Sequence, residues 1–234
     1  MYAMILNMQY SFKSVQATEY NPFTIDSDAH LTQSAQYGIW QETLGKKVLH
    51  FELRDEEQVL VITGQYIAYP LIKSYSYWYA PYGPVISSDT SPEAIERFLA
   101  GVKEEAQKHH AVFVRSELPE KYDYKETVPF LSKSSYTQER CEWIIDATQT
   151  TEDILKNMEQ KTRYNVRLAE KKNLTVAVEK ESISDASKAI FLQLMEDTAK
   201  RNGFRLHEDG YSETIFDNLN KEKNGAVVII LNND

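Results

Sequence analysis

The apolar positions in the first half of the chain change from a helical period to a strand period and back. Residues 34–44 place aromatic side chains on one helical face, and Gly45 gives that predicted helix its C-terminal stop. Apolar and polar residues then alternate from 48 to 54, which predicts the first of two strands on either side of the acidic turn at 55–57. Apolar residues at helical spacing between 91 and 110 predict the next helix.

The second half continues this mixture of helices and strands. It begins at Thr150, where threonine and the acidic residues after it are typical of a helix N-terminus. In the helix predicted at 184–202, we expect Ile190, Leu194 and Ala199 to be buried. The other predicted elements are a short buried strand at 111–115, strands at 136–146, 174–179 and 226–231, and helices at 158–174 and 211–221.

The last predicted strand, 226–231, has an apolar residue at every position. Such a run indicates a strand that is buried on both faces and has a neighbour on each edge. The chain ends three residues later, although the same order of helix, strand and acidic turn at 34–57 is followed by a second strand. We therefore expect the chain to be a fragment that stops within a hairpin.

One predicted helix concentrates positive charge on an acidic protein. The chain has 35 acidic residues against 26 lysines and arginines, yet the helix at 158–174 has a basic polar face. This pattern indicates a local docking site for an anionic partner, and a solvated helix face is the alternative that charge alone favours. The basic residues are Lys161, Arg163, Arg167, Lys171 and Lys172.

Composition restricts the remaining classes of function. A chain of 234 residues is long enough for one large domain or two small ones. The single Cys141 rules out an internal disulfide and a multi-cysteine zinc site, and the five histidines show no ligand spacing, so we expect no metal. The sequence has neither a long apolar run nor the features of a signal peptide, so we expect a cytoplasmic location.

Three segments of the chain resemble the motifs of a known family. Residues 31–48, LTQSAQYGIWQETLGKKV, are similar to a Gln-Ser pair that is followed by an aromatic helix and Leu-Gly. Residues 79–85, YAPYGPV, resemble Tyr-X-Pro-basic-Gly-Pro-Val, and residues 158–174 resemble Met-X-X-Lys-Thr-Arg-Tyr-Asn-Ile-Arg-X-Ala. These motifs are those of the FemABX peptidyltransferases, which build the interpeptide bridges of peptidoglycan. The resemblance covers the whole chain and leaves the last third of the family's length absent.

The resemblance implies a mixed α/β fold of two acetyltransferase-like domains, one at 1–147 and an incomplete second one at 148–234. The first domain would bind the acceptor. The order of predicted elements in the two halves agrees with this fold. Because the missing part should complete the second sheet and the cleft, we expect the chain as given to lack full activity.

The resemblance also implies a reaction that uses no cofactor. An aminoacyl group passes from aminoacyl-tRNA to the stem-peptide amine of a UDP-linked or lipid-linked muropeptide, and a lipid-linked acceptor would bring the protein to the periphery of the membrane. The basic helix would contact the tRNA acceptor end through Lys161, Arg163, Arg167 and Lys171. A competing account is internal, with Arg163 and Tyr164 packed between the two halves. The oligomeric state stays open.

The family's acceptor-binding residues fall on Gln41, Tyr82, His207 and Tyr211 of this chain. Two family anchors for the precursor's diphosphate, a lysine and an arginine, are replaced by Gln41 and His207, and the basic residue of the second motif is replaced by Tyr82. Either a different acceptor is bound or neighbouring cations compensate. Tyr211 matches a family tyrosine that lines the acceptor cleft. The neighbouring cations are Lys46, Arg201 and Arg205.

Glu117 aligns with a family carboxylate near the cleft and is the candidate catalytic residue. It would orient the incoming amine or accept its proton, and a solvated carboxylate at a strand end is the alternative. Arg115 is either an ion-pair partner of Glu117 or a phosphate ligand. Tyr37 and Trp40 are expected in the core, because their spacing already explains them as a buried stripe.

Two other functions stay open on the sequence. An acyl-CoA-dependent N-acyltransferase would keep the fold, but it needs a pyrophosphate loop of the form Gln/Arg-X-X-Gly-X-Gly/Ala, which does not occur in these residues. A non-catalytic relative that binds the precursor would account for the missing basic residues at positions 41, 82 and 207.

Overall fold

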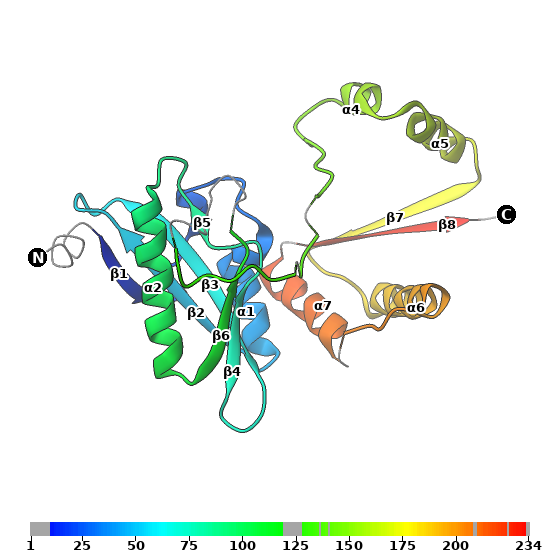
Figure 1. The fold of residues 1–234 in the computed structure, drawn as a ribbon. Helices are drawn as coiled ribbons and strands as arrows, with labels where there is room; N and C mark the ends of the chain where they lie inside the picture. The colour runs from blue at the N-terminus through cyan, green and yellow to red at the C-terminus, as the bar shows by residue number, and fades with distance from the viewer. Residues whose placement is uncertain are drawn as a thin grey trace, which may run out of the picture. The chain divides into compact units, whose positions relative to one another are not determined.

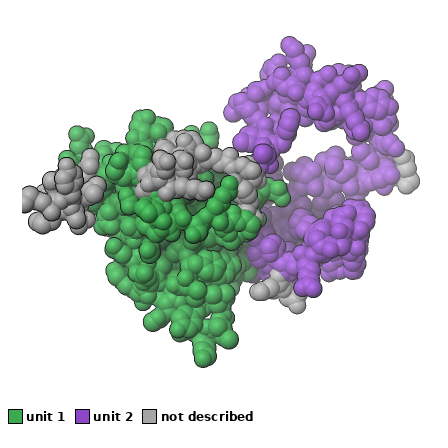
Figure 2. All heavy atoms as spheres, in the orientation of Figure 1, with its two compact units in different colours: residues 1–140 green, residues 141–234 purple. Residues whose placement is uncertain are grey.

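The chain forms two compact units in a computed structural model, residues 1–140 and residues 141–234 (Figures 1 and 2). Each unit has its own sheet. The structure describes residues 10–118, 128–135, 137–139, 141–207, 210–223 and 225–232.

The first unit contains a sheet of order β1-β2-β3-β4-β6, with β5 paired to β3. Neighbouring strands are antiparallel except β4 and β6, which are parallel and are joined through helix α2. A parallel pair needs such a crossover because its strands run in the same direction. The strands are β1 (Ser11–Val15), β2 (Lys47–Arg54), β3 (Leu60–Pro70), β4 (Ser76–Ala80), β5 (Val85–Ile86) and β6 (Ala111–Ser116).

Helix α2 (Pro92–Lys108) covers one face of this sheet (Figure 1). Ser91 caps it by accepting a hydrogen bond from the Ala94 backbone N–H at 3.2 Å, and proline occupies its first turn. Its apolar side packs on the strands, where the largest fully buried side chains include Phe98, Trp78 and Phe51. The hydrophobic core of the unit therefore lies between α2 and the sheet.

The opposite face of the sheet is covered by helix α1 (Ala35–Thr43) and the short helix η3 (Leu31–Gln33). A further short helix, η2 (Pro22–Thr24), precedes them. Ser34 accepts a hydrogen bond from the Tyr37 backbone N–H at 3.1 Å and so caps α1. Because alternate residues of a strand point to opposite faces, the residues of β2 beside Phe51 face α1 instead of α2.

The second unit contains an antiparallel pair, β7 with β8, and four helices among the described residues. Helix α6 packs on α7 through Phe191 and Phe216, whose rings meet edge to face at 5.1 Å. Gly203 ends α6 in the left-handed conformation. The elements are α4 (Thr151–Asn157), α5 (Gln160–Glu170), β7 (Leu174–Lys180), α6 (Asp185–Asn202), α7 (Tyr211–Glu222) and β8 (Ala226–Asn232).

Most elements predicted from the sequence form within a few residues of their expected bounds, but the strand predicted at 136–146 is wrong. The described residues of that segment form no strand, and Trp143 and Ile144 are 84% and 86% exposed. Among the described residues, no strand pairs with this segment. The basic helix is also shorter than predicted, because α5 spans Gln160–Glu170.

Three expectations of burial are corrected as well. Strand β6 lies at the edge of its sheet, so Val112 is exposed although the strand was expected to be buried. Strand β8 pairs with β7 alone among the described strands, and Ile230 is 62% exposed, whereas burial on both faces was predicted. In α6, Ile190 and Leu194 are exposed, because that helix packs mainly through other positions.

Candidate functional site

The YAPYGPV turn, residues 79–85, is fixed to the end of β6 by the Glu117 carboxylate. Its Oε1 accepts a hydrogen bond from the Tyr79 hydroxyl at 2.7 Å and one from the Gln138 backbone N–H at 3.2 Å. Its Oε2 accepts from the Tyr82 backbone N–H at 2.8 Å. Glu117 therefore joins three segments of the first unit at one carboxylate.

These contacts limit the chemistry that Glu117 can perform. Burial, together with the hydrogen bond to Glu117, raises the pKa of Tyr79, so this hydroxyl keeps its proton and donates it. A carboxylate has about four lone-pair positions, and three donors already occupy Glu117. One acceptor position is left for a ligand. A carboxylate held in this way suits the orientation of an incoming amine, because Glu117 cannot move far without losing its three hydrogen bonds. Proton acceptance by Glu117 stays a prediction.

The underside of the same turn rests on the fully buried Gln33 side chain. Its Nε2 donates to the Pro81 carbonyl at 2.9 Å, and its Oε1 accepts from the Gln65 backbone N–H at 2.9 Å. A Cβ atom added at Gly83 would lie 2.4 Å from the Gln33 amide. The Gln-Ser pair of the first motif therefore supports the second motif, because Gln33 holds the turn and Ser34 caps α1.

A buried polar network continues beneath the turn. The Gln65 Oε1 atom lies 2.8 Å from His50 Nε2, and Gln65 Nε2 donates to the Thr32 carbonyl at 3.0 Å. The Tyr20 hydroxyl donates to Gln33 Oε1 at 3.3 Å. Burial lowers the pKa of His50, while its bond to Gln65 opposes that change, so the ring is neutral at neutral pH. The network makes the base of the turn rigid.

Tyr82 occupies the position where the family motif has a basic residue. Its ring stacks on His30 with centroids 3.9 Å apart, and its hydroxyl donates to the Glu139 carbonyl at 3.1 Å. Its φ angle is 50°, a left-handed conformation within the turn. Tyr82 thus presents an aromatic face and no positive charge.

Arg115 lies on the same face of β6 as Glu117, two residues earlier in the strand. Its guanidinium donates to the Ser134 hydroxyl at 2.8 Å and to the Thr137 hydroxyl. These bonds attach the 134–138 segment, which also donates to Glu117, to the edge of the sheet. Arg115 thereby shapes the rim of the site, and its role as a phosphate ligand stays a prediction.

Gln41 is almost completely buried in α1. Its Oε1 accepts a hydrogen bond from Lys46 Nζ at 3.2 Å, and its Nε2 has no hydrogen-bond partner among the described residues. Lys46 Nζ also lies 4.5 Å from the centre of the Tyr69 ring, within the range of a cation–π contact. A positive charge therefore stands beside the buried Gln41 amide.

The remaining acceptor-binding predictions, His207 and Tyr211, lie in the second unit. Their rings stack with centroids 4.0 Å apart, and burial raises the pKa of the half-buried Tyr211. A hollow of about 140 Å³ has His207 on its wall, and an open hollow of about 590 Å³ is lined in part by Lys200 and Arg205. Arg205 thus supplies a cation near His207 in the chain.

The basic helix α5 divides into one structural arginine and several exposed cations. Arg163 donates to the Lys156 carbonyl at 2.9 Å and to the Met158 carbonyl, which braces the link between α4 and α5. Lys161, Arg167 and Lys171 are exposed, and no ion pair joins them to acidic side chains in the part of the chain that the structure describes. Arg163 is therefore already bound to carbonyl groups of its own unit, and the tRNA contact predicted for it would compete with these hydrogen bonds.

Sequence reasoning missed Gln33, Gln65 and His50, which build the base of the turn. The signal for Gln33 was present in the Gln-Ser motif, but its partner, the Pro81 carbonyl, lies 48 positions away in the chain. Among the described residues, no group of His, Cys, Asp or Glu side chains is arranged to bind a metal. No described helix has both the length and the apolar character that crossing a membrane requires.

Comparison with known proteins gives the context of this site. The crystal structure of FemX aligns with a TM-score of 0.71 at 19% identity, over 94% of this chain and 57% of FemX. This chain thus spans little more than half the length of FemX, with which it shares the predicted mixed α/β fold. No curated protein matches the chain.

Two acetyltransferases of known structure align less well. Glucosamine-6-phosphate N-acetyltransferase from Arabidopsis thaliana has a TM-score of 0.41 at 9% identity, over 57% of this chain and 99% of that chain. An acetyltransferase from Trypanosoma brucei has a TM-score of 0.39 at 8% identity, with the same coverage of the two chains. These scores are too low to carry an argument.

A model of the FemAB family matches residues 15–128 and 130–232. The two matched ranges include all three motif segments and extend through both compact units. The chain belongs to the FemAB family.

Proposed function

We propose that this protein is an aminoacyltransferase of cell-wall bridge synthesis. It moves an amino acid from aminoacyl-tRNA to the stem-peptide amine of a peptidoglycan precursor, on the cytoplasmic side of the membrane. The observation that carries this proposal is the FemAB family match through both units, residues 15–128 and 130–232. The FemX-like fold supports it.

The chemistry of this reaction is attack of a neutral amine on an ester carbonyl, for which positioning contributes most. Glu117 supplies a fixed acceptor for one N–H of the amine, because its other lone pairs are bound by Tyr79, Tyr82 and Gln138. Held in this way, the amine would keep a constant direction toward the ester. As the amide bond forms, the ester C–O bond to the tRNA ribose would break, and the proton that the amine loses would pass through Glu117 or water to the leaving ribose oxygen.

Binding of the precursor would use the cations that stand near the replaced anchors. Within the first unit, Lys46 would supply a cation beside Gln41, where the family has its lysine. Within the second unit, Arg205 would supply one near His207 in the chain, where the family has its arginine. Tyr82 would contribute its aromatic face instead of a charge, and Tyr211 would line the cleft. With these contacts, the protein could bind a peptidoglycan precursor although Gln41, Tyr82 and His207 carry no permanent charge.

The donor would be bound through exposed cations of α5 and of its C-cap residue, Lys171. Lys161, Arg167 and Lys171 are available to phosphates of the tRNA acceptor end, whereas Arg163 is occupied by carbonyl groups. Because the protein carries a net charge of −9, this contact would be weak and strongly dependent on salt.

The test is a transfer assay with radiolabelled aminoacyl-tRNAs. The full-length protein is mixed with a UDP-linked muropeptide in one reaction and a lipid-linked one in another, and label on the peptide is measured. Transfer to either acceptor supports the proposal and identifies the donated amino acid. Transfer from acetyl-CoA alone would contradict the proposal and favour an acyl-CoA-dependent N-acyltransferase. Binding of the precursor without transfer would contradict it and favour a non-catalytic binding protein.

A matched pair of variants tests the role of Glu117. Glu117→Gln keeps the size of the side chain but weakens the acceptor, so transfer should fall by about 10- to 1,000-fold. Glu57→Gln removes an exposed carboxylate in the β2–β3 turn and should leave transfer unchanged. Equal rates for the two variants would remove Glu117 from the mechanism.

A further inference from the structure

The turn between β3 and β4 exposes apolar side chains at one end of the first unit. Leu71, Ile72 and Tyr75 are 50%, 72% and 49% exposed, and Lys73 lies between them. We call residues 71–75 the apolar turn. Isolated exposed apolar residues are normal on a protein surface, but three within five residues at a protruding tip form a patch.

The apolar turn has an ordered backbone. The Leu71 N–H donates to the Tyr75 carbonyl at 2.9 Å, and the Tyr75 N–H donates to the Ile72 carbonyl at 3.2 Å. Lys73 has a φ of 57°, which reverses the chain, and the Tyr75 ring meets His110 edge to face at 6.5 Å. The apolar side chains are thus presented by a closed turn, which loses little conformational entropy on binding.

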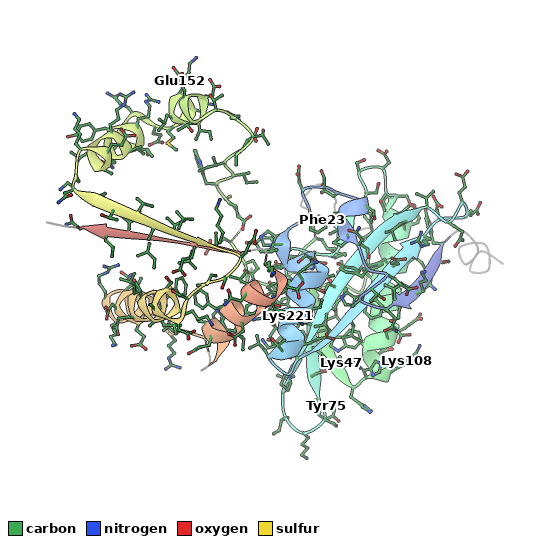
Figure 3. All side chains as sticks on the ribbon, turned by 180° about the vertical axis from the view of Figure 1, so that it is seen from behind. Phe23, Lys47, Tyr75, Lys108, Glu152 and Lys221 are labelled. Carbon is green, nitrogen blue, oxygen red and sulfur yellow. The ribbon has the colours of Figure 1, made fainter. Side chains whose placement is uncertain are left out.

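Two further lysines lie at the same end of the unit as this tip. Lys47 begins β2 opposite Ala68 of β3, and Lys108 ends α2 immediately before the strand that pairs with β4. Figure 3 shows Lys47, Tyr75 and Lys108 at the same end of the unit. Lys108 is paired with Glu105 at 2.7 Å, so Lys47 and Lys73 carry most of the available positive charge.

The β3–β4 hairpin that carries the apolar turn contains no acidic residue. Between Glu57 and Asp89 the chain has no acidic residue, and Lys73 is its one charged side chain. The opposite end of β2 and β3 carries the acidic turn at 55–57 and the exposed Val59. The hairpin around the apolar turn therefore carries one positive charge and no negative one, and Glu105 at this end is already paired with Lys108.

We propose that the apolar turn inserts into the headgroup region of a bilayer that contains anionic lipid. Leu71 and Ile72 would reach the boundary of the acyl chains, and the Tyr75 ring has the amphipathic character that suits this interface. Lys73 and Lys47 would contact anionic headgroups, each contributing about fivefold to binding at low salt. The membrane is bound at its surface and is not crossed.

The size of the patch favours a bilayer over a protein partner. A stable protein–protein interface takes about 800 Å² from each partner, and one five-residue turn does not supply that area. A bilayer accepts a few apolar side chains at a time and adds charge attraction over the whole surface. The association would be weak and reversible. This inference stands independently of the proposed function.

The test is flotation of the protein with vesicles at low salt. We expect it to float with vesicles of equal parts phosphatidylcholine and phosphatidylglycerol, and much less with phosphatidylcholine alone. Ile72→Asp should lower the bound fraction at least tenfold, and Lys73→Gln should lower the affinity about fivefold. Val59→Asp is the matched control, because Val59 is similarly exposed beside the acidic turn, at 53%, and binding should not change.

Three results would overturn the inference. One is the absence of flotation with anionic vesicles, and another is an equal loss for Ile72→Asp and Val59→Asp. The third is self-association of the lipid-free protein that Ile72→Asp abolishes, because the turn would then bind a second copy of the chain. Tryptophan fluorescence of each variant checks that the first unit is folded, since Trp40 and Trp78 are buried there.

Discussion

The two units of this protein differ in how far each builds an interior of its own. The first unit buries a continuous cluster that includes Phe51, Trp78 and Phe98. In the second unit, the described apolar side chains that are buried are Ile183, Ala199 and Phe216. Since burial of apolar area is the main source of folding free energy, the first unit should be much the more stable of the two.

Polar groups show the same contrast. In the first unit, Gln33, Gln65 and His50 form a network inside the fold, where an unpaired group would be costly. In the second unit, the ion pair of Lys188 with Asp217 lies at the surface, where water and salt weaken it. The turn with Glu117 therefore rests on a rigid, hydrogen-bonded support, whereas α5 is little stabilised by its surroundings.

The largest expected effect comes from truncating one phenylalanine in each unit. Phe98→Ala leaves a cavity in a fully buried position and should lower the free energy of unfolding by about 3–5 kcal/mol. Phe191→Ala, at a side chain that is 39% exposed, should cost about 1 kcal/mol. Urea unfolding combined with hydrogen exchange of each unit measures both values. Equal costs would show that the second unit has an interior comparable to the first.

A smaller effect is expected from adding one methyl group to a glycine. Gly83→Ala brings Cβ to 2.4 Å from the fixed Gln33 amide and should cost about 1–3 kcal/mol, with displacement of the turn. Gly203→Ala in the second unit meets no atom within 4 Å and is penalised only by its φ of 72°, by about 1 kcal/mol. Thermal unfolding ranks the two variants. A harmless Gly83→Ala would contradict the close fit described for the turn.

Substitutions in the basic helix can distinguish residues that stabilise the second unit from residues that bind a ligand. Arg163→Ala removes the bonds to the Lys156 and Met158 carbonyls and should destabilise the α4–α5 link by about 1 kcal/mol. Lys161→Ala with Arg167→Ala should leave stability unchanged but reduce the salt dependence of tRNA binding. Hydrogen exchange over 150–170 and filter binding distinguish these outcomes. If Arg163→Ala loses tRNA binding but keeps its protection from hydrogen exchange, Arg163 contacts tRNA and does not stabilise the α4–α5 link.

The smallest effect is a dependence of stability on pH that arises from His50. Burial lowers its pKa from the ordinary value of 6.5, so the unfolded chain binds a proton below that pH while the folded protein does not. The contribution to stability is therefore complete above pH 6.5, falls as the pH drops through it, and levels off below the lowered pKa. Urea unfolding at several pH values should show this slope, and His50→Gln should reduce it. An unchanged slope would mean that His50 is accessible to protons in the folded state.

Much of the secondary structure followed from local sequence. The alternation at 48–54 and the helical spacing at 91–110 gave β2 and α2, because each pattern needs only one apolar face. The strand predicted at 136–146 failed, because a strand also needs a partner and none pairs with it among the described residues. The prediction that β8 is buried was wrong for a related reason. A run of apolar residues does not determine which element, if any, covers the strand.

The candidate site was predictable only where a motif carried it. The family resemblance pointed to Glu117, Tyr82, Gln41 and Tyr211 as candidate residues. It did not predict which groups these side chains contact. Whether Glu117 bonds to Arg115 or to Tyr79 depends on how strand ends and turns meet, and the spacing of residues in the chain does not determine that. The sequence suggests Lys46 as a neighbouring cation because it is close to Gln41 in the chain, and the structure places its Nζ 3.2 Å from Gln41 Oε1, while compensation for a missing anchor stays a prediction.

The order and type of most elements, the acidic balance, the basic helix and the family resemblance could all be inferred from the sequence. These are local or compositional properties, which the chain carries before it folds. Tertiary structure alone decided that Gln33 supports Pro81, that Arg163 is bound by carbonyl groups and that the apolar turn stands exposed beside Lys47. Such features depend on segments far apart in the chain, and packing of the sheet against its helices is what brings them together.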